Sequence, residues 1–263
     1  MPARITFLPG AEAEGPPAWR LVLTDDRGRF IEPVESLFAC RNEPAGRAWA
    51  YGGDRVIYEL SPGHYFWCAS AGFEWTMTGG QFRVGGPRPI DIAVRLRRIA
   101  DAAAEGFVSG DTHVHAWRKA QEPSLEVPFL AEGLDLAGAQ CWGLYTGGSA
   151  KGTPPRTPLF RCGRAWVSTD QEVEMHSPWG VWEDTTVMGL TAPLPDLCDG
   201  FGYRMNAPYF LAARERNCAM IVYQAPTWAQ FLVDVGLGLV DSVNVCDNFL
   251  SMTQPEEGPW DYT

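Results

Sequence analysis

The spacing of apolar residues divides the chain into two parts near residue 100. Between residues 19 and 98 the apolar runs are short and are cut by turn residues. WRLVLTDDRGRF indicates a strand, a DDRG turn and the start of another strand, and RVIYELSPGHYFWCAS indicates two strands around a Ser-Pro-Gly turn. Short strands with Gly and Pro turns and no helical period are typical of an antiparallel β-sandwich. We therefore predict an all-β N-terminal domain over residues 1–100.

A different pattern follows residue 100, where short strands alternate with helical segments. THVHAW, LAGAQCWG, CAMIVYQA and VDSVNVC indicate strands, whereas GGSAKGTPPRTPLF has the composition of a loop. PSLEVPFLAEGLD, NAPYFLAARERN and TWAQFLVDVGLG indicate helices, and Asn206 is the expected N-cap of the second one. Strands that alternate with helices favour βα units around a mainly parallel sheet or barrel. We therefore predict an α/β domain over residues 101–263.

Composition narrows the class of partner. The chain has 263 residues and a formal net charge of -11, which argues against a nucleic acid or an anionic membrane surface as partner. No apolar run approaches the roughly 20 residues that span a bilayer, and the first residues do not resemble a secretory signal. The seven cysteines are scattered without a CxxC pair, as expected of reduced thiols. We expect a cytoplasmic protein.

The stretch GDTHVHAW carries the first candidate site. Asp111, His113 and His115 occupy every second position, so a regular strand places them on one face. Imidazole nitrogen combined with carboxylate oxygen favours a divalent metal ion, with Zn²⁺ first and Mn²⁺ or Fe²⁺ as alternatives, over Ca²⁺. The alternative interpretation is a half-buried strand whose histidines hydrogen-bond locally.

A second row of the same kind lies in STDQEVEMHSPWG. Glu172, Glu174 and His176 also alternate and share a face of a strand. The alternative is a solvated polar strand face, but two strands that each carry an alternating row of acids and histidines argue against a chance pattern. We predict one bound divalent metal ion, with ligands drawn from Asp111, His113, His115, Glu172 and His176. Glu174 is the predicted general base, whereas His64 lies in the other domain and is interpreted as structural.

With these residues in place, the chain resembles the CehA/McbA family of metallohydrolases, which are relatives of the PHP (polymerase and histidinol phosphatase) domain. GDTHVH is similar to the family's GDxHxH, and SPGHYFWCASAGFEW is similar to a segment of its N-terminal β-sandwich. AEGLDLAGA, DQEVEMHSPWG, NAPYFLAARERNCAMIVYQAPTW and GLVDSVNVCDNF follow the family's later order of elements. The resemblance covers nearly the whole chain and is most specific around residues 106–115.

The resemblance implies a PHP-like βα barrel and a metal site. His113 and His115 match the family's first metal-binding pair, Asp111 matches its accompanying carboxylate, and Glu172 or Glu174 matches its next acidic ligand. The chain departs from the family where AQCWGLYT replaces a TDHN-like motif and where Val181 follows Gly180 in place of histidine, with His176 as a displaced substitute. These departures favour a single metal ion over a multinuclear centre.

The α/β domain is also short for a closed barrel. It has about 155 residues counted from residue 109, whereas whole α/β barrels have roughly 200 or more. The family's last Gly-Ser-Asp segment is expected beyond the region of residue 248, and the sequence ends at Thr263. We therefore expect an incomplete barrel whose open edge is covered by a second copy of the chain or by a separate second chain.

The eleven tryptophans of the chain indicate a chemical class of substrate. Five of them lie just past predicted strands or in the following loops: Trp117, Trp142, Trp179, Trp182 and Trp228. Strand carboxyl ends face the binding crevice in α/β folds, so these rings favour a planar, aromatic or apolar small molecule. The alternative is packing in the core or at an interface. The predicted substrate-binding residues are Trp117, Trp142, Trp179 and Trp228, with Gln224, which replaces the family's later histidine.

The sequence thus favours a metal-dependent hydrolase that cleaves an amide, ester or carbamate bond of a small apolar or aromatic molecule. The same metal site also suits a metal-dependent cyclase or lyase. A second hypothesis is a non-catalytic or partner-dependent subunit that keeps a degenerate PHP-like fold and binds a ligand or another chain. A serine or cysteine hydrolase lacks support, because the chain has no GxSxG motif.

Overall fold

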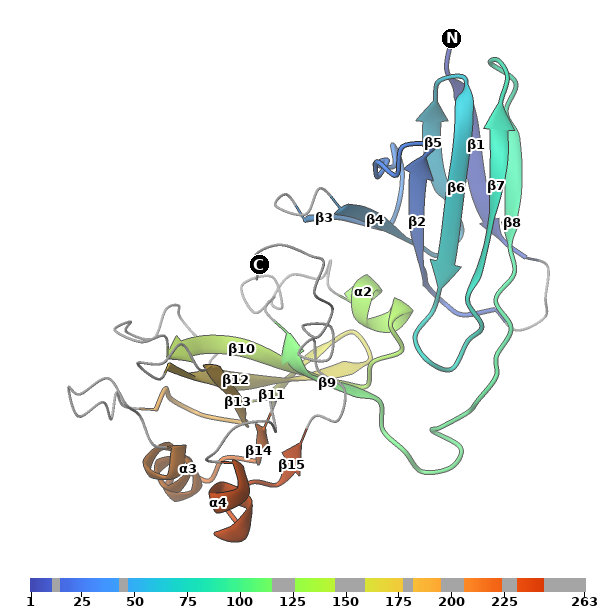
Figure 1. Ribbon diagram of the computed structural model, residues 1–263. Helices are drawn as coiled ribbons and strands as arrows, with labels where there is room; N and C mark the ends of the chain where they lie inside the picture. The colour runs from blue at the N-terminus through green and yellow to red at the C-terminus, as the bar shows by residue number, and fades with distance from the viewer. Residues whose placement is uncertain are drawn as a thin grey trace.

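The computed structural model describes residues 1–10, 15–42, 47–114, 126–144, 159–176, 182–194, 206–223 and 231–243. Two β-rich bodies follow one another along the chain (Figure 1). The N-terminal sandwich comprises β1 (Ala3–Pro9), β2 (Trp19–Asp25), β3 (Phe38–Asn42), β4 (Arg47–Gly52), β5 (Val56–Leu60), β6 (Gly63–Ser70), β7 (Thr78–Val84) and β8 (Ile90–Val94). One sheet has the order β5-β1-β8 and the other the order β3-β4-β2-β6-β7.

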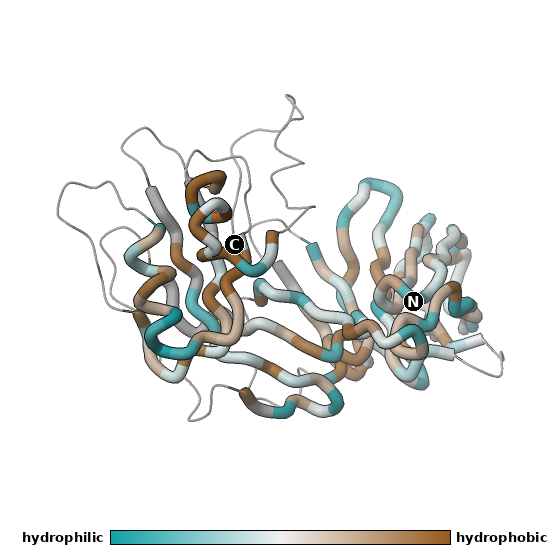
Figure 2. Tube along the Cα trace, turned by 90° about the horizontal axis from the view of Figure 1, so that it is seen from below, coloured by the Kyte–Doolittle hydropathy of each residue, from teal (hydrophilic) through white to brown (hydrophobic). Residues whose placement is uncertain are grey.

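Alternation along each strand builds the core of the sandwich. On β2, Trp19, Leu21 and Leu23 are buried, and the residues between them are more accessible to solvent. Phe7 of β1 is fully buried and meets Tyr58 edge-on at a ring-centroid distance of 5.9 Å. Figure 2 shows hydrophobic residues concentrated where the elements of each body pack together, with hydrophilic residues at many turns. The period-two pattern therefore sets which side of each strand faces the other sheet.

The second body contains one larger sheet, here called the C-terminal sheet. Its strands are β9 (Gly110–Val114), β10 (Leu136–Leu144), β11 (Leu159–Cys162), β12 (Ala165–His176), β13 (Trp182–Met188), β14 (Met220–Tyr223) and β15 (Ser242–Val243). The helices are α2 (Glu126–Ala131), α3 (Asn206–Glu215) and α4 (Phe231–Gly236). The strand order is β15-β14-β13-β12-β10-β9, with β11 also paired to β12, and the sheet curves as a half-barrel (Figure 1).

The predicted α/β class with a helix-rich PHP-like barrel is wrong. The described residues are mostly strand, with three helices of 6, 10 and 6 residues. β12 pairs antiparallel with both β11 and β13, and β13 pairs antiparallel with β14. One physical reason for the antiparallel pairing is the turn in LFRCGR, whose first two residues end the stretch interpreted as a loop. Gly163 has a φ of 59° and closes a tight β11–β12 hairpin there.

Helix α2 is shorter than its sequence pattern predicts. The expected segment PSLEVPFLAEGLD contains a helix only over Glu126–Ala131, with Pro128 in the first turn, where proline is tolerated. The helix ends at Ala131, and Gly133 follows it with a φ of 69°, which favours glycine, while the Leu134 amide returns to the carbonyl of Phe129 at 2.9 Å. The six-residue helix therefore packs through one short face, and it is shorter than the helices that cover the outside of a βα barrel.

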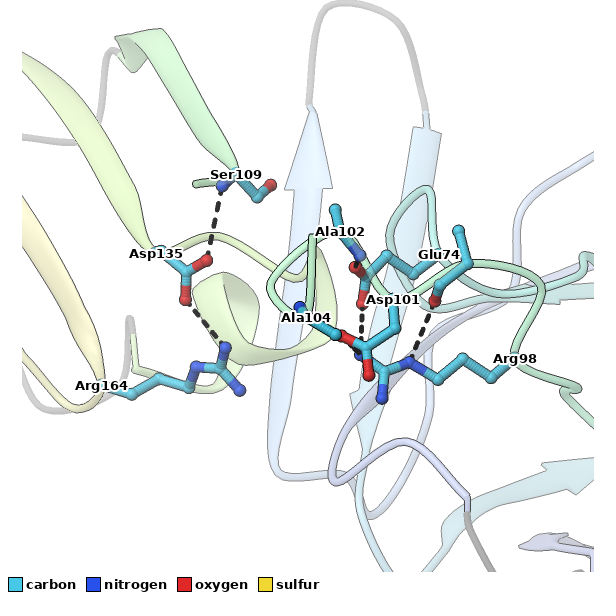
Figure 3. Close-up of polar contacts among 9 residues, drawn as sticks. Glu74, Arg98, Asp101, Ala102, Ala104, Ser109, Asp135 and Arg164 are labelled. Carbon is cyan, nitrogen blue, oxygen red and sulfur yellow. Dashed lines mark hydrogen bonds and ion pairs between the residues drawn. The ribbon is translucent and has the colours of Figure 1, made fainter. Parts of the chain in front are cut away.

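Polar contacts order the segment between the two bodies (Figure 3). The Glu74 carboxylate accepts a hydrogen bond from the Ala102 amide at 2.6 Å and pairs with Arg98 at 2.9 Å. Arg98 also pairs with Asp101 at 3.0 Å. These contacts hold residues 98–102 against the loop that follows β6, so the chain leaves the sandwich along a defined path.

A second contact joins the two bodies through the residue after α2. Glu132 accepts a hydrogen bond from the Tyr51 hydroxyl at 3.1 Å and pairs with Arg20 at 3.0 Å. Burial and the Glu132 carboxylate raise the pKa of the Tyr51 hydroxyl. Gly72 lies against the Glu132 carbonyl, where an added Cβ would come within 2.5 Å of the oxygen. The sandwich therefore forms a support for the start of the C-terminal sheet.

Helices pack on one face of the C-terminal sheet. The buried cluster joins Phe129 of α2 and Tyr209 and Phe210 of α3 to strand residues that include Ala137 and Val167. Asn206, the predicted N-cap, is buried at the start of α3, and its side-chain amide donates to the Tyr223 hydroxyl and to the Asp234 carboxylate, each at 3.0 Å. This network ties α3, β14 and α4 together.

Among the described residues, no helix has the length and apolar character needed to cross a bilayer. The cytoplasmic location stays a prediction.

The sandwich core provides a stability prediction. Phe7→Ala removes a fully buried ring that packs on Tyr58, Trp67 and Phe82, so we expect the free energy of unfolding to fall by about 3–5 kcal/mol. Phe73→Ala is the matched control, because that ring is 98% exposed, and a change within about 0.5 kcal/mol is expected. Urea unfolding followed by tryptophan fluorescence measures both. Equal effects of the two substitutions would contradict the assigned core.

Candidate functional site

Strand direction places the candidate residues at one edge of the C-terminal sheet. β10 pairs parallel with β9 and β12, and β14 pairs parallel with β15. β13 is antiparallel to both β12 and β14, so β14 runs in the same direction as β12. The carboxyl ends of β9, β10, β12 and β14, at residues 114, 144, 176 and 223, therefore lie at the same end of the sheet, here called the carboxyl edge. Ligands bind at this edge in sheets with parallel strands.

The two polar rows identified in the sequence belong to β9 and β12. Only β10 separates these strands, so the rows are about 10 Å apart at the usual strand spacing. The two faces of the sheet differ in character. Ala137, Ala139 and Val167 face the helices and belong to the hydrophobic cluster. We call the opposite face, which carries Gly138 and Ser168 as a cross-strand pair, the inner face.

A β-bulge on β9 changes which residues share a face. Asp111 pairs with Ala137 and Val114 pairs with Ala139, so β9 has one more residue than β10 between these pairs. Paired residues point to the same side, which places Asp111 with the two alanines on the helix face. The regular alternation expected for Asp111 and His113 is therefore interrupted at the bulge.

Asp111 has a local structural role in the bulge. Its Oδ1 accepts a hydrogen bond from the backbone amide of His113 at 2.9 Å, and the residue is exposed. An aspartate that binds the amide two residues ahead stabilises a turn-like backbone. The start of β9 is set separately by Asp135, which accepts a hydrogen bond from the Ser109 amide at 3.4 Å and pairs with Arg164 at 2.8 Å (Figure 3).

The structure adds Asp170, a buried acid that the sequence argument did not select. Its exposed fraction is 0%, and its Oδ1 accepts a hydrogen bond from the Gly189 amide at 3.0 Å. Its Oδ2 is buried and accepts no hydrogen bond from the residues that the structure describes. Gly189 follows β13 with a φ of 73°, a conformation that lets its amide face the carboxylate.

Burial dominates the electrostatics of Asp170. Desolvation raises the pKa of the carboxyl from 3.8 to about 7, against the opposing effects of the Gly189 amide, the Ser168 hydroxyl and the charge of His113. Asp170 Oδ2 and the Thr112 carbonyl both border Gly138, so the bulge that carries His113 lies beside this carboxylate. Asp170 and His113 are the pair of candidate groups that the described structure brings together.

Gly138 of β10 lies between them. A Cβ atom on this residue would overlap the Oδ2 atom of Asp170 and would come within 2.7 Å of the Thr112 carbonyl oxygen. Real Cβ atoms do not make such contacts, so glycine is required for the carboxylate to lie over β10. The missing side chain leaves the space in which Asp170 extends towards β9.

The other predicted residues are placed only in part. Glu172, Glu174 and His176 continue the alternation of Asp170 along β12, where their backbones pair with Thr186, Asp184 and Trp182 of β13. Their side chains, and that of Trp142 on β10, lie outside the description. Also outside the described residues are His115, Trp117, Trp179, Trp228 and Gln224. Among the described side chains, no three His, Cys, Asp or Glu residues gather as a metal-binding group.

The described residues fit a divalent cation at this point of the sheet. An isolated carboxylate in a sheet interior is costly unless a cation or hydrogen bonds compensate it, and one oxygen of Asp170 accepts no hydrogen bond from the described residues. An imidazole nitrogen beside a carboxylate oxygen is a donor pair typical of Zn²⁺, Mn²⁺ and Fe²⁺ sites.

The sequence alone contained one signal for Asp170, because the alternating row in TDQEVEMH extends back to this residue.

Comparison with known protein families, with curated proteins and with solved structures finds no match for this chain. The resemblance to the CehA/McbA family therefore stays a hypothesis.

The raised pKa of Asp170 predicts a pH dependence for metal-free protein. The folded state keeps a proton that the unfolded chain releases above its pKa of about 4, so rising pH favours unfolding until about pH 7. Asp170→Asn cannot ionise and keeps an oxygen for the Gly189 amide. Its free energy of unfolding, relative to wild type, should rise with pH by up to about 1.4 kcal/mol per unit over this interval.

Urea unfolding in the presence of EDTA at several pH values between 4.5 and 7.5 measures this difference. Asp54→Asn, at an exposed position in the sandwich, is the control and should parallel wild type throughout. If the curves of Asp170→Asn and wild type also run parallel, the carboxyl is not buried as described.

Proposed function

We propose that the protein is a metal-dependent hydrolase that cleaves an amide, ester or carbamate bond in a small apolar or aromatic molecule. The observation that supports this most is the position of Asp170 and of the bulge that carries His113, on strands either side of β10, beside the space that Gly138 leaves open. The acidic positions 172 and 174 continue from Asp170 towards the carboxyl edge. A histidine and a row of acids at that edge suit hydrolysis better than simple packing.

His113 supplies one ligand, and His115, Glu172 and His176 are the proposed further ligands from the two rows. A bound divalent cation lowers the pKa of water and polarises a carbonyl oxygen. Glu174 takes the proton of the attacking water as general base. Asp111 is not in this set, because its carboxylate accepts a hydrogen bond from the His113 amide and because the residue belongs to the helix face of the sheet. Trp117, Trp142, Trp179, Trp228 and Gln224 are the proposed substrate contacts.

A second candidate is a partner-dependent subunit, and one surface favours it. Helix α4 exposes apolar side chains, with Leu232 76% exposed and Val233 55% exposed. This helix immediately precedes β15, which forms one edge of the C-terminal sheet. Exposed apolar side chains beside a sheet edge favour association with a second copy or another chain. Native mass spectrometry of the purified protein separates a monomer from such an assembly.

Zinc binding and hydrolysis test the proposed function together. After removal of metal with EDTA and reconstitution with Zn²⁺, we expect wild type to retain zinc in elemental analysis. It should also hydrolyse members of a panel of aryl esters, anilides and aryl carbamates. His113→Ala should lose both properties, because it removes a proposed ligand. His64→Ala is the matched control, since His64 packs on Phe66 in the sandwich at a ring-centroid distance of 4.8 Å, and it should keep both.

Two results would contradict the proposal. One is folded wild-type protein that takes up no zinc, manganese or iron after reconstitution. The other is zinc-loaded protein that releases no product from any member of the panel, which favours the binding subunit. Reaction in ¹⁸O-labelled water separates hydrolysis from elimination or cyclisation, because only hydrolysis places the label in the product.

A further inference from the structure

The Asp170 carboxylate has two oxygens in different situations. Oδ1 is held by the Gly189 amide at 3.0 Å, at the turn that follows β13. Oδ2 is buried and accepts no hydrogen bond from the described residues, His113 included. Asp170 also takes part in none of the ion pairs that the described residues form. An ionised oxygen in this position lacks the compensation that buried charges require.

The Oδ2 atom of Asp170 lies on the side of β12 that faces β10 and β9. It lies over Gly138, where a Cβ atom would occupy its space, and the Thr112 carbonyl borders the same gap. His113 follows Thr112 on the bulge, so it lies beside the same gap. The two groups are near one another, yet Oδ2 accepts no hydrogen bond from the imidazole. This arrangement differs from a histidine that is merely oriented by a carboxylate, where a direct hydrogen bond is expected.

We infer that Asp170 is a metal ligand, and that its Oδ2 and the His113 imidazole bind one divalent cation across Gly138. The donor pair favours Zn²⁺ among the common divalent ions. Asp170 thereby takes the place that the sequence argument assigned to Asp111 as the acid accompanying the histidines. The inference concerns the same site as the proposed function and deepens it, because it assigns the acidic ligand that fixes the cation in the sheet interior.

Gly138 has a positioning role in this arrangement. A methyl group at residue 138 overlaps the carboxylate and also presses on the backbone of Thr112, without altering any ligand atom. Gly110 of β9 provides a matched comparison, because a Cβ there would lie 3.4 Å from its nearest neighbours, an ordinary contact. Gly138→Ala and Gly110→Ala thus add the same group to neighbouring strands of one sheet, but only Gly138→Ala disturbs Asp170 and the Thr112 backbone beside it.

The test measures zinc affinity by competition with a chromophoric chelator, using Zn²⁺ alone and full-length protein at neutral pH. Asp170→Asn should bind zinc about 100-fold more weakly than wild type or not at all, and Gly138→Ala should bind at least about 10-fold more weakly. Gly110→Ala should stay within about threefold of wild type. Asp234→Asn, which changes a buried acid of α4 that accepts a hydrogen bond from Asn206, should also stay within about threefold.

A second measurement shows that any loss of affinity does not come from unfolding. Circular dichroism and thermal unfolding in EDTA should show Asp170→Asn folded, since loss of a buried charge does not destabilise the metal-free protein. Cobalt(II) substitution provides a spectroscopic signature: the visible absorption of the wild-type cobalt complex should be lost or altered in Asp170→Asn and unchanged in Gly110→Ala.

The outcomes separate this inference from the proposed function. Zinc affinity of Asp170→Asn within threefold of wild type, with binding lost in His113→Ala, overturns the inference and leaves the hydrolase proposal standing. Zinc binding that depends on Asp170, in a protein that hydrolyses none of the tested substrates, supports the inference and counts against the hydrolase. Folded wild-type protein without zinc affinity overturns both.

Discussion

The burial of one carboxylate constrains the rest of the candidate site. Asp170 lies in the interior of the C-terminal sheet with no exposed surface, and desolvation opposes its ionisation strongly enough to move its pKa to about 7. The Gly189 amide compensates one oxygen, and the other faces the gap over Gly138. A fold that keeps an acid in such a place either holds a proton there or supplies a cation. The neighbouring histidine favours the cation.

Several unrelated features converge on this carboxylate. The turn after β13 has a glycine with positive φ that aims an amide at it, and β10 has a glycine where any side chain would displace it. The bulge on β9 brings His113 to its side of the sheet, and Asp135 anchors the strand just before the bulge. Each feature alone has an ordinary structural explanation. Their combination at one buried charge is what gives the inner face a chemical interpretation.

The strands were the most predictable part of the fold, and their partners were the least. Short apolar runs bounded by turn residues located β2, β5 and β6. The class of the second body was wrong, since the pairing of β11, β12 and β13 depends on long-range register rather than on local pattern. The loop-like composition before β11 also concealed a hairpin that rests on one glycine, Gly163.

The candidate site shows the same division between local and distant information. The predicted strand THVHAW overlaps β9 (Gly110–Val114) at residues 112–114, yet the spacing could not reveal a bulge that arises from pairing with β10. Asp170 stood in the alternating row of TDQEVEMH, but its importance comes from burial and from Gly138 on another strand. Asn206 was expected as a helix cap, but the hydrogen bonds of its side-chain amide to Tyr223 and Asp234 were not foreseen. Properties that depend on a neighbouring strand or helix were therefore not accessible from the sequence.

The most direct measurement is an anomalous difference map, recorded at the zinc absorption edge, from crystals of the protein grown with Zn²⁺. The account predicts a peak between β9 and β12, about 2.0–2.2 Å from Asp170 Oδ2 and from a ring nitrogen of His113. A peak bonded to His113 with Asp170 remote from it, or no peak in this part of the sheet, would contradict the account.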